Sequence, residues 1–307
     1  MKLCNDVLNI IANYLPLRDA IKMSNLKKNF MDLHMEHYTF DKYNGSFIMK
    51  HANYLKRIEI ENNRKLIKMF VDSNSFSQKI KYLNLDNKNM TDKYLGRFKS
   101  IYIHTLRVCY GDYITNKGLK HLKDIHTLCL NSNRSITDEG LKYLKNIHTL
   151  CLRGNKNITD EGLKHLKGIH TLDLSSNNNI TDEGLEYLKG IHTLNLYHNK
   201  NITDEGLKHL KGIHTLDLSS NKNITDEGLK HLKGIHTLDL SSNNNITDEG
   251  LEYLKGIHTL NLYHNKNITD RGLEYLEGIY ELHLHHNKNI TDEKLKHLNV
   301  TLNNYNF

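Results

Sequence analysis

Apolar positions repeat along most of the chain with a period of 22 residues. Nine isoleucines from Ile114 to Ile290 are each 22 residues apart, and from Ile136 onward each begins an Ile-Thr-Asp triplet. One unit reads I-x-x-L-x-L-x-x-N-x-x-I-T-D-x-G-L-x-x-L, and residues 169–188 are an instance of it. A fixed period of this length is typical of stacked repeat proteins, in which each repeat is one small structural unit.

Each unit predicts a strand, a turn and a short helix. Leu172 and Leu174 alternate with polar residues, which predicts a strand with one buried face. Asn177 follows in a turn, and in stacked units we expect these asparagines to form a buried hydrogen-bond ladder. Thr181 is the predicted N-cap of the helix, and the two acidic residues after it favour the positive end of the helix dipole. Gly190 is predicted to end the helix.

The units are expected to stack, because none of them can bury its apolar face alone. Strands stack about 4.8 Å apart and helices about 8–10 Å apart, so the array should curve with its strands on the concave side. Less regular copies near residues 55, 80 and 103 raise the predicted number of strands to eleven, the last at residues 282–284.

This pattern resembles the leucine-rich repeat over about 250 of the 307 residues. The I-T-D-x-G-L-x-x-L half is similar to the cysteine-containing subfamily, although the units are shorter and Asn177 stands where that subfamily often has cysteine. The resemblance implies an α/β fold, a right-handed solenoid with a parallel concave sheet and short convex helices. Residues 155–204 are also identical to residues 221–270, a shift of three repeats, which indicates expansion by copying.

The first 42 residues lack the repeat and predict a small helical segment. Leu8, Ile11 and Leu15 are spaced for a helix that ends at Pro16. Asp19 can cap a second helix, and a third helical stretch is expected to run toward residue 37. We therefore divide the chain into a helical segment (1–42), degenerate leading repeats (43–102), regular 22-residue repeats (103–298) and a C-terminal cap (299–307).

This helical segment resembles an F-box, the motif through which substrate adaptors dock onto the Skp1–cullin ubiquitin ligase. The residues that match the family pattern are Leu3, Asp6, Val7, Leu8, Ile11, Tyr14, Leu15, Asp19, Ala20, Met23, Leu26, Lys28 and Phe30. Two departures are Cys4 in place of the family proline and Phe30 in place of the tryptophan. The resemblance implies docking on Skp1 through Leu3, Val7, Leu8, Ile11, Leu15, Pro16, Leu17, Met23 and Leu26. The alternative is that these helices only cover the exposed apolar end of the array, as terminal repeats require.

The outward residues of the predicted concave strands form columns that can bind a partner. This face is polar and mostly made of small residues, with an acidic middle and two Tyr-His pairs, and tyrosine is a favoured interface anchor. The candidate target-binding residues are Arg107, Arg153, Asp173, Asn195, Tyr197, His198, Asp217, Asp239, Asn261, Tyr263, His264, His283 and His285. The alternative is a solvated sheet face without a strong partner.

The charge balance does not favour a nucleic-acid partner. The chain carries 42 Lys and Arg against 35 Asp and Glu, a formal net charge of +7, but it has no Lys/Arg cluster of the usual kind. The acidic middle of the concave face also argues against nucleic acid, and salt-sensitive binding would be the discriminating observation.

The sequence has no signature of catalysis or of a cofactor. It contains no G-x-S-x-G, G-x-x-x-x-G-K-[ST], H-E-x-x-H or C-x-x-C motif. Most of the 21 histidines occupy two copied positions of the repeat, so we expect no metal site. The one cluster that merits a metal test is His264, His283, His285 and His286. Cys129 and Cys151 lie one predicted strand apart, within reach of a disulfide, but reduced thiols are expected.

The sequence predicts an intracellular protein, cytoplasmic or nuclear and not secreted. Polar residues interrupt the apolar stretch of residues 1–16, which argues against a signal peptide, and no apolar run reaches the ~18–20 residues of a membrane span. We therefore expect a non-catalytic adaptor of an SCF-type (Skp1–cullin–F-box) ubiquitin ligase, monomeric by itself, whose repeats bind an unknown target protein. The alternative is an interaction scaffold with no link to ubiquitin ligation.

Overall fold

The structure is a computed structural model that describes residues 38–40, 57–60, 80–85, 90–100 and 102–297. The chain divides into two units, Met1–Leu130 and Asn131–Phe307. All nine residues expected to dock on Skp1 lie outside the described residues, as does the C-terminal cap predicted at 299–307.

The second unit contains short parallel strands that follow one another in chain order. Each strand has three residues and pairs in register with the strand of the next repeat, so that Leu172 lies beside Leu194 and Leu194 beside Leu216. The described strands of this unit are β6 (Thr149–Cys151), β7 (Thr171–Asp173), β8 (Thr193–Asn195), β9 (Thr215–Asp217), β10 (Thr237–Asp239), β11 (Thr259–Asn261) and β12 (Glu281–His283).

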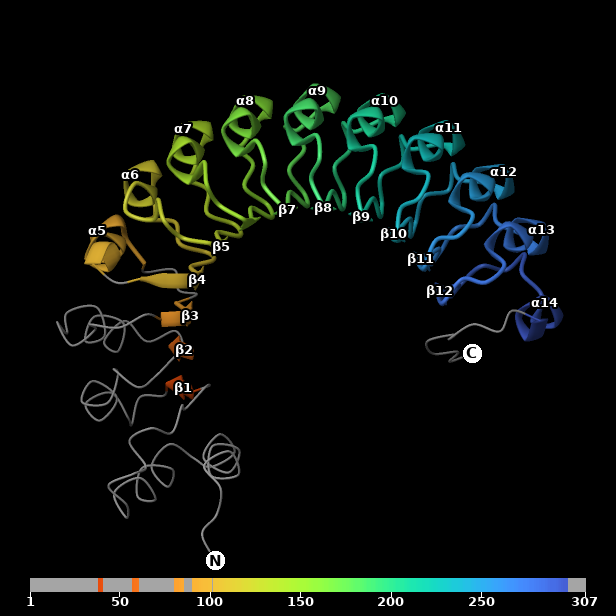
Figure 1. The fold of residues 1–307 in the computed structure, drawn as a ribbon, viewed down its shortest axis with the longest axis horizontal. Coiled ribbons are helices and arrows are strands. Elements are labelled where there is room, and N and C mark those ends of the chain that lie inside the picture. Colours follow the sequence, from red (N-terminus) through yellow and green to blue (C-terminus); the bar gives the residue numbers. More distant parts are fainter. Residues whose placement is uncertain (1–37, 41–56, 61–79, 86–89, 101, 298–307) are drawn as a thin grey trace, which may run out of the picture. The chain divides into compact units, whose positions relative to one another are not determined.

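A short helix lies between successive strands. The helices are α7 (Asp138–Leu141), α8 (Asp160–Leu163), α9 (Asp182–Leu185), α10 (Asp204–Leu207), α11 (Asp226–Leu229), α12 (Asp248–Leu251), α13 (Asp270–Leu273) and α14 (Asp292–His297). The first seven continue into 3₁₀ turns at Lys142–Leu144, Lys164–Leu166, Glu186–Leu188, Lys208–Leu210, Lys230–Leu232, Glu252–Leu254 and Glu274–Leu276. Within this unit the strands lie on the inner side of a curve and the helices on the outer side (Figure 1), as the difference in stacking distance predicts.

The core of the second unit is built from leucine and isoleucine of every repeat. Around β7, the side chains of Leu172, Ile180 and Leu185 are at most 1% exposed, and those of Leu188 and Ile191 at most 3%. The equivalent residues of the neighbouring repeats are buried in the same way. The apolar positions of the 22-residue pattern are therefore core positions.

The predicted asparagine ladder is confirmed. Asn177 is fully buried, and its Nδ2 donates to the carbonyl oxygen of Leu152, in the preceding repeat, at 2.9 Å. The same bond, at 2.8 Å, joins Asn221 to Leu196, Asn243 to Leu218 and Asn287 to Leu262. Each asparagine thus ties its turn to the end of the strand region before it.

The Thr-Asp pair forms a second ladder that the sequence pattern did not reveal. Thr181 precedes α9 with extended backbone, as an N-cap residue should. Its amide and its hydroxyl both donate to Asp160 of the preceding repeat, at 2.9 Å and 2.7 Å. This pair of hydrogen bonds recurs at each interface from Asp138–Thr159 to Asp270–Thr291. The aspartate predicted to favour its own helix end therefore also joins neighbouring repeats.

Two positions of the repeat require glycine, each for a different structural reason. Gly190, predicted to end the helix, has a φ of +83°, in the left-handed region that glycine adopts without strain. Gly184 lies inside α9, where a Cβ would collide with the Oδ1 of Asp160. The Gly in the D-x-G-L segment is thus required by the carboxylate of the preceding repeat, a role that sequence reasoning missed.

The first unit has the same plan with less regular spacing. Its described strands are β1 (Tyr38–Phe40), β2 (Arg57–Ile60), β3 (Ile80–Asn84), β4 (Ile103–Arg107) and β5 (Thr127–Cys129), parallel and in chain order. Its described helices are α5 (Asp92–Arg97), a 3₁₀ turn (Phe98–Ser100) and α6 (Asn116–Leu119). The eleven predicted strands are all present, and β1 is an additional one inside the range 1–42 that we assigned to a helical segment.

Candidate functional site

The strands of the second unit present a column of half-buried polar side chains one position after the central leucine. The column runs in register through Cys151, Asp173, Asn195, Asp217, Asp239, Asn261 and His283. Six of the predicted target-binding residues therefore lie side by side on the inner face. Arg107 holds the equivalent place on β4 of the first unit, and its Nη1 donates to the Sγ of Cys129 at 3.8 Å.

The Asp and Asn side chains of this column hold the bend that follows each strand. The N–H of Ser219 donates to the Oδ1 of Asp217 at 2.9 Å, and its hydroxyl donates to the same oxygen at 2.5 Å. The N–H of Tyr197 donates in the same way to Asn195 at 2.8 Å. Burial raises the pKa of Asp217, the charges of Asp239 and then Asp173 add to that effect, and the bonds from Ser219 oppose it. These carboxylates and amides are thus partly structural and only partly available to a partner.

A second column contains Arg153, Tyr197, Tyr263 and His285, which follow their strands by two residues. Tyr263 is 37% exposed, Arg153 is exposed and Tyr197 is half-buried. The next residue along the chain is His198 or His264, and each has a positive φ near 60°. This backbone turns sharply away from the sheet, so the Tyr-His pairs lie where the inner face meets its edge.

An aromatic cluster surrounds Tyr263. Its ring meets His264 edge-on at 4.2 Å between centroids and His286 at 5.3 Å, and His264 stacks on His286 at 4.5 Å. The ring centroid of His285 lies 6.4 Å from that of the same tyrosine, whereas the Nε2 of His283 lies 3.3 Å from the Oε1 of Glu281. Aromatic packing, rather than converging lone pairs, accounts for three of these four histidines. Among the residues that the structure describes, no group of three His, Cys, Asp or Glu side chains could hold a metal ion.

The histidines of the I-H-T-L segments in the second unit, from His148 to His258, form a continuous stack, which sequence reasoning missed. The imidazoles of His148, His170, His192, His214, His236 and His258 lie face to face with centroids 4.4–4.5 Å apart, and Tyr280 ends the stack at 4.6 Å. The Nδ1 of each imidazole lies 3.0–3.1 Å from the Oγ1 of the following threonine. Removal of water by the neighbouring rings lowers the pKa of His170 and of His214, and the charges of the flanking histidines lower it further. The signal was present in the sequence as a column of identical aromatic residues on adjacent strands.

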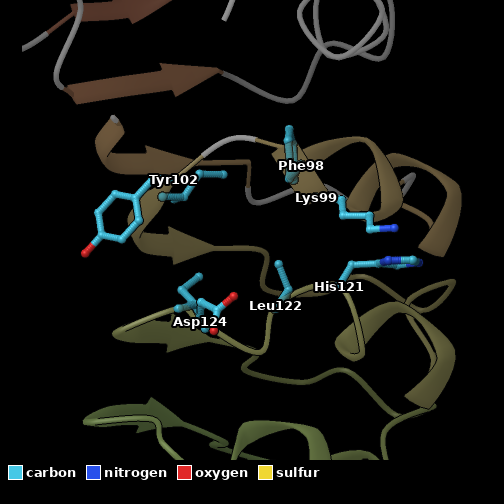
Figure 2. A pocket seen from close by; sticks show the side chains of 8 residues that line it. Phe98, Lys99, Tyr102, His121, Leu122 and Asp124 are labelled. Atoms are coloured by element: carbon cyan, nitrogen blue, oxygen red, sulfur yellow. The ribbon is translucent and has the colours of Figure 1, made fainter. Parts of the chain in front are cut away.

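A hollow of about 210 Å³ lies in the first unit (Figure 2). It follows the repeat in which the paired strands β3 and β4 are 23 rather than 22 residues apart, from Ile80 to Ile103. The side chains of Lys99 and His121 lie on one side of it and that of Asp124 lies on another (Figure 2). Among the described contacts, neither Lys99 nor His121 forms an ion pair with Asp124. Cys109, Cys129 and Cys151 are present as thiols.

A model of the leucine-rich repeat matches residues 121–145, 143–167, 169–189, 191–211, 213–233, 235–255 and 257–276. The matched part of the chain belongs to the leucine-rich-repeat family. The resemblance inferred from the 22-residue pattern is therefore confirmed, and so is the leucine-rich-repeat solenoid. No curated protein sequence matches the chain.

Several solved structures resemble this leucine-rich-repeat chain. A chain of the Rad7–Elc1 complex from yeast has a TM-score of 0.53 at 16% identity, covering 86% of this chain and 89% of that one. A chain of the TLR13–ssRNA13 complex has a TM-score of 0.55 at 17% identity, covering 83% of this chain and 40% of that one. An internalin C2 of Listeria monocytogenes is 31% identical, with a TM-score of 0.46 and coverage of 61% and 84%. The first two likenesses show the fold alone. Within the described residues, no helix is long and apolar enough to span a bilayer.

Proposed function

We propose that this chain is a substrate-recognition adaptor of an SCF-type ubiquitin ligase. Leucine-rich repeats are a protein-interaction fold, and in this proposal the inner face of the second unit holds the target. The F-box-like residues of segment 1–42 hold a Skp1-like protein that is itself bound to a cullin. The chain is not an enzyme in this scheme, because it contributes proximity and orientation while partner enzymes transfer ubiquitin. An intracellular location belongs to the same proposal.

The preorganised inner face is the observation that best supports target binding. The side chains of Asp217, Asn195 and their equivalents fix the bend after each strand through hydrogen bonds to the backbone. A surface that is already ordered loses little conformational entropy when a partner binds. Tyr197 and Tyr263 then stand at equivalent places three repeats apart, and tyrosine is enriched at the energetic centres of interfaces.

Two sets of substitutions separate the two halves of the proposal. Val7→Asp with Leu15→Asp should abolish capture of purified Skp1 by the full-length protein, because charge is placed on the predicted docking helix. Tyr197→Ala with Tyr263→Ala should leave Skp1 capture intact and weaken recovery of target proteins cross-linked in the native cell. Failure of the intact protein to bind Skp1, or unchanged capture by the Val7/Leu15 variant, would leave an interaction scaffold without a ligase link.

The likeness to the Rad7–Elc1 complex does not decide between these alternatives. At 16% identity it shows the fold alone. The adaptor proposal therefore depends on the F-box resemblance of residues 1–42 and on the Skp1 experiment.

A further inference from the structure

One edge of the second unit carries a row of cations. The residue that follows each ladder asparagine by one position is exposed, and in six repeats it is basic; we call Arg134, Lys156, Lys200, Lys222, Lys266 and Lys288 the basic edge. Asn178 and Asn244 fill the two intervening places. The net charge does not reveal this row, because residues 131–307 carry 20 Lys and Arg against 23 Asp and Glu.

The lysines of the basic edge differ from the lysines of the convex helices. Six helix lysines are paired with a glutamate three residues before them, for example Lys164 with Glu161 at 2.6 Å and Lys189 with Glu186 at 3.1 Å. No ion pair in the described part of the chain joins a residue of the basic edge to a carboxylate. The charge of these six helix lysines is thus compensated locally, whereas the charge of the edge is available to a ligand. Lys145, Lys167, Lys211 and Lys233, which follow the 3₁₀ turns, likewise have no ion pair among the described contacts and serve below as the matched control.

The backbone under the basic edge is held rigidly. A second row of asparagines, two positions after the buried ladder, donates Nδ2 to the carbonyl of the edge residue one repeat earlier. The distance is 2.7 Å from Asn223 to Lys200 and from Asn289 to Lys266, and 2.6 Å from Asn245 to Lys222. The amide of Lys200 also donates to the Oδ1 of Asn178 at 3.2 Å. These hydrogen bonds therefore hold the backbone of one edge residue in each of these repeats in a fixed position.

Aromatic side chains lie beside two pairs of edge lysines. His198, Lys200, Ser220, Lys222 and Asn223 line an open hollow of about 420 Å³. Three repeats later the same places hold His264, Lys266, His286, Lys288 and Asn289, and there the exposed ring of Tyr263 meets both histidines. Cations and flat rings thus lie side by side at two places on this border, the combination with which proteins hold a sugar–phosphate chain and stack its bases.

We propose that the basic edge, with Tyr197, Tyr263 and their neighbouring histidines, binds single-stranded nucleic acid. Phosphates contact the lysines that succeed one another along the edge, and unpaired bases stack on the tyrosine and histidine rings. A single strand is favoured over a duplex because bases must leave their own stack to reach those rings. This surface shares Tyr197 and Tyr263 with the target-binding face proposed above, but the basic edge lies outside that face and its binding does not depend on the adaptor role.

The acidic column of the inner face, which in the sequence spoke against a nucleic-acid partner, is distinct from the basic edge. The acidic column of the inner face is half-buried, and the Oδ1 of Asp173, Asp217 and Asp239 each accepts two hydrogen bonds from the following serine. These carboxylates therefore face the bend that follows their own strand rather than the basic edge. The edge itself carries only positive and neutral side chains.

The test measures fluorescence anisotropy of labelled 20-nucleotide dT and U strands with the full-length protein at several salt concentrations. The quadruple variant Lys200→Gln, Lys222→Gln, Lys266→Gln and Lys288→Gln should bind at least about tenfold more weakly, and its salt slope should fall by about three. The matched control, which removes the same charge from the convex side, is Lys145→Gln, Lys167→Gln, Lys211→Gln and Lys233→Gln. It should change the affinity less than about twofold.

A second variant tests the stacking half of the proposal. Tyr263→Leu should weaken binding at least about fivefold, whereas Tyr263→Phe should retain it. Three results would overturn the proposal: no binding by the intact protein at low salt, equal losses in the two quadruple variants, or displacement of the strand by poly-glutamate at equal charge concentration. The last result would identify the edge as a site for acidic peptides instead.

Discussion

The glycine inside each short helix is explained by a residue from another repeat. Gly184 has no side chain because the carboxylate of Asp160 fills that space while it accepts both bonds from Thr181. A glycine inside a helix usually lowers the stability of that helix, because its helix propensity is low. Here its cost is offset by a hydrogen-bonded contact between repeats.

We expect Gly184→Ala to destabilise the array by about 1–3 kcal/mol, because the added methyl overpacks the Asp160 contact. In an Asp160→Ala background the same substitution should cost much less, since the obstructing carboxylate is gone. A double-mutant cycle from urea unfolding measures this coupling. Additive effects of the two substitutions would contradict the explanation.

Asp217 is predicted to oppose folding at neutral pH. The pKa of its carboxyl is raised in the folded state, so the folded protein favours the protonated carboxyl over the ionised one. The stabilisation by the protonated form is present at low pH and is lost as the pH rises through the folded pKa. Asp217→Asn keeps the acceptor for Ser219, and Asn195 and Asn261 show that an amide serves in this column. We expect the variant to melt roughly 1–2 °C higher at pH 7, with the difference vanishing below pH 4.

Asp160→Asn is the matched control for that prediction. Both oxygens of Asp160 accept a bond from Thr181, and an amide can replace only one of them. This variant should therefore melt lower than the parent protein at pH 7. An Asp217→Asn variant that also melts lower would show that the inner-face carboxylate is a net stabiliser.

At the scale of the element, each strand is too short to be stable by itself. Three residues of β7 make few backbone bonds, and the repeat is held instead by ladders that run across the strands: the buried asparagines, the Thr-Asp bonds and the stacked imidazoles. Most of these contacts join residues about 21–25 positions apart. Stability therefore lies in the interfaces between repeats rather than within one repeat.

The histidine stack should make the array sensitive to acid. Because the pKa of His170 and of His214 is lowered in the folded state, the unfolded chain binds more protons just below its own histidine pKa of about 6.5. Stability should therefore be complete above about pH 7 and fall as the pH drops from about 6.5 through the folded pKa values. Urea midpoints measured between pH 7.5 and 5 test this dependence.

A variant in which His148, His170, His192, His214, His236 and His258 are all replaced by glutamine supplies the control. Its urea midpoint should change less between pH 7.5 and 5, because the stacked charges are absent. Replacement of His165, His209 and His231, which lie in the 3₁₀ turns, and of Lys167, Lys211 and Lys233 by glutamine should leave the acid sensitivity in place. An unchanged pH profile in the six-histidine variant would exclude the stack as its origin.

At the scale of the whole molecule, the copied block should allow three repeats to be deleted without creating a new kind of interface. Residues 155–204 and 221–270 are identical, so removal of residues 155–220 joins Gly154 to a segment with the same sequence as the one it lost. Every remaining interface is one that the intact chain already contains. The shortened protein should fold with the same far-UV spectrum per residue and unfold at a lower urea concentration, since three interfaces are missing.

A deletion that ignores the period is the control. Removal of residues 155–209 brings a strand sequence to the place of a helix, so the ladders cannot continue across the junction. This variant should lose cooperative unfolding, as followed by circular dichroism in urea. If both deletions behaved alike, stability would not be carried by nearest-neighbour interfaces.

The sequence alone determined the repeat, its strand–turn–helix order, the buried asparagines and the curvature. These features follow from a period that is visible along the chain, because apolar spacing and stacking distance are local properties. Leu172, Asn177 and Ile180 could be placed in the core for this reason.

Only the tertiary structure decided which side chains work together across repeats. The collision at Gly184, the bonds from Thr181 to Asp160 and the asparagine bond beneath Lys200 all depend on residues of neighbouring units. The pairing of the convex lysines, by contrast, is local: Glu161 precedes Lys164 by three residues in one helical segment, so the spacing in the sequence already contains that ion pair. Only the stacking of repeats places an asparagine of the next repeat beneath a lysine of the basic edge.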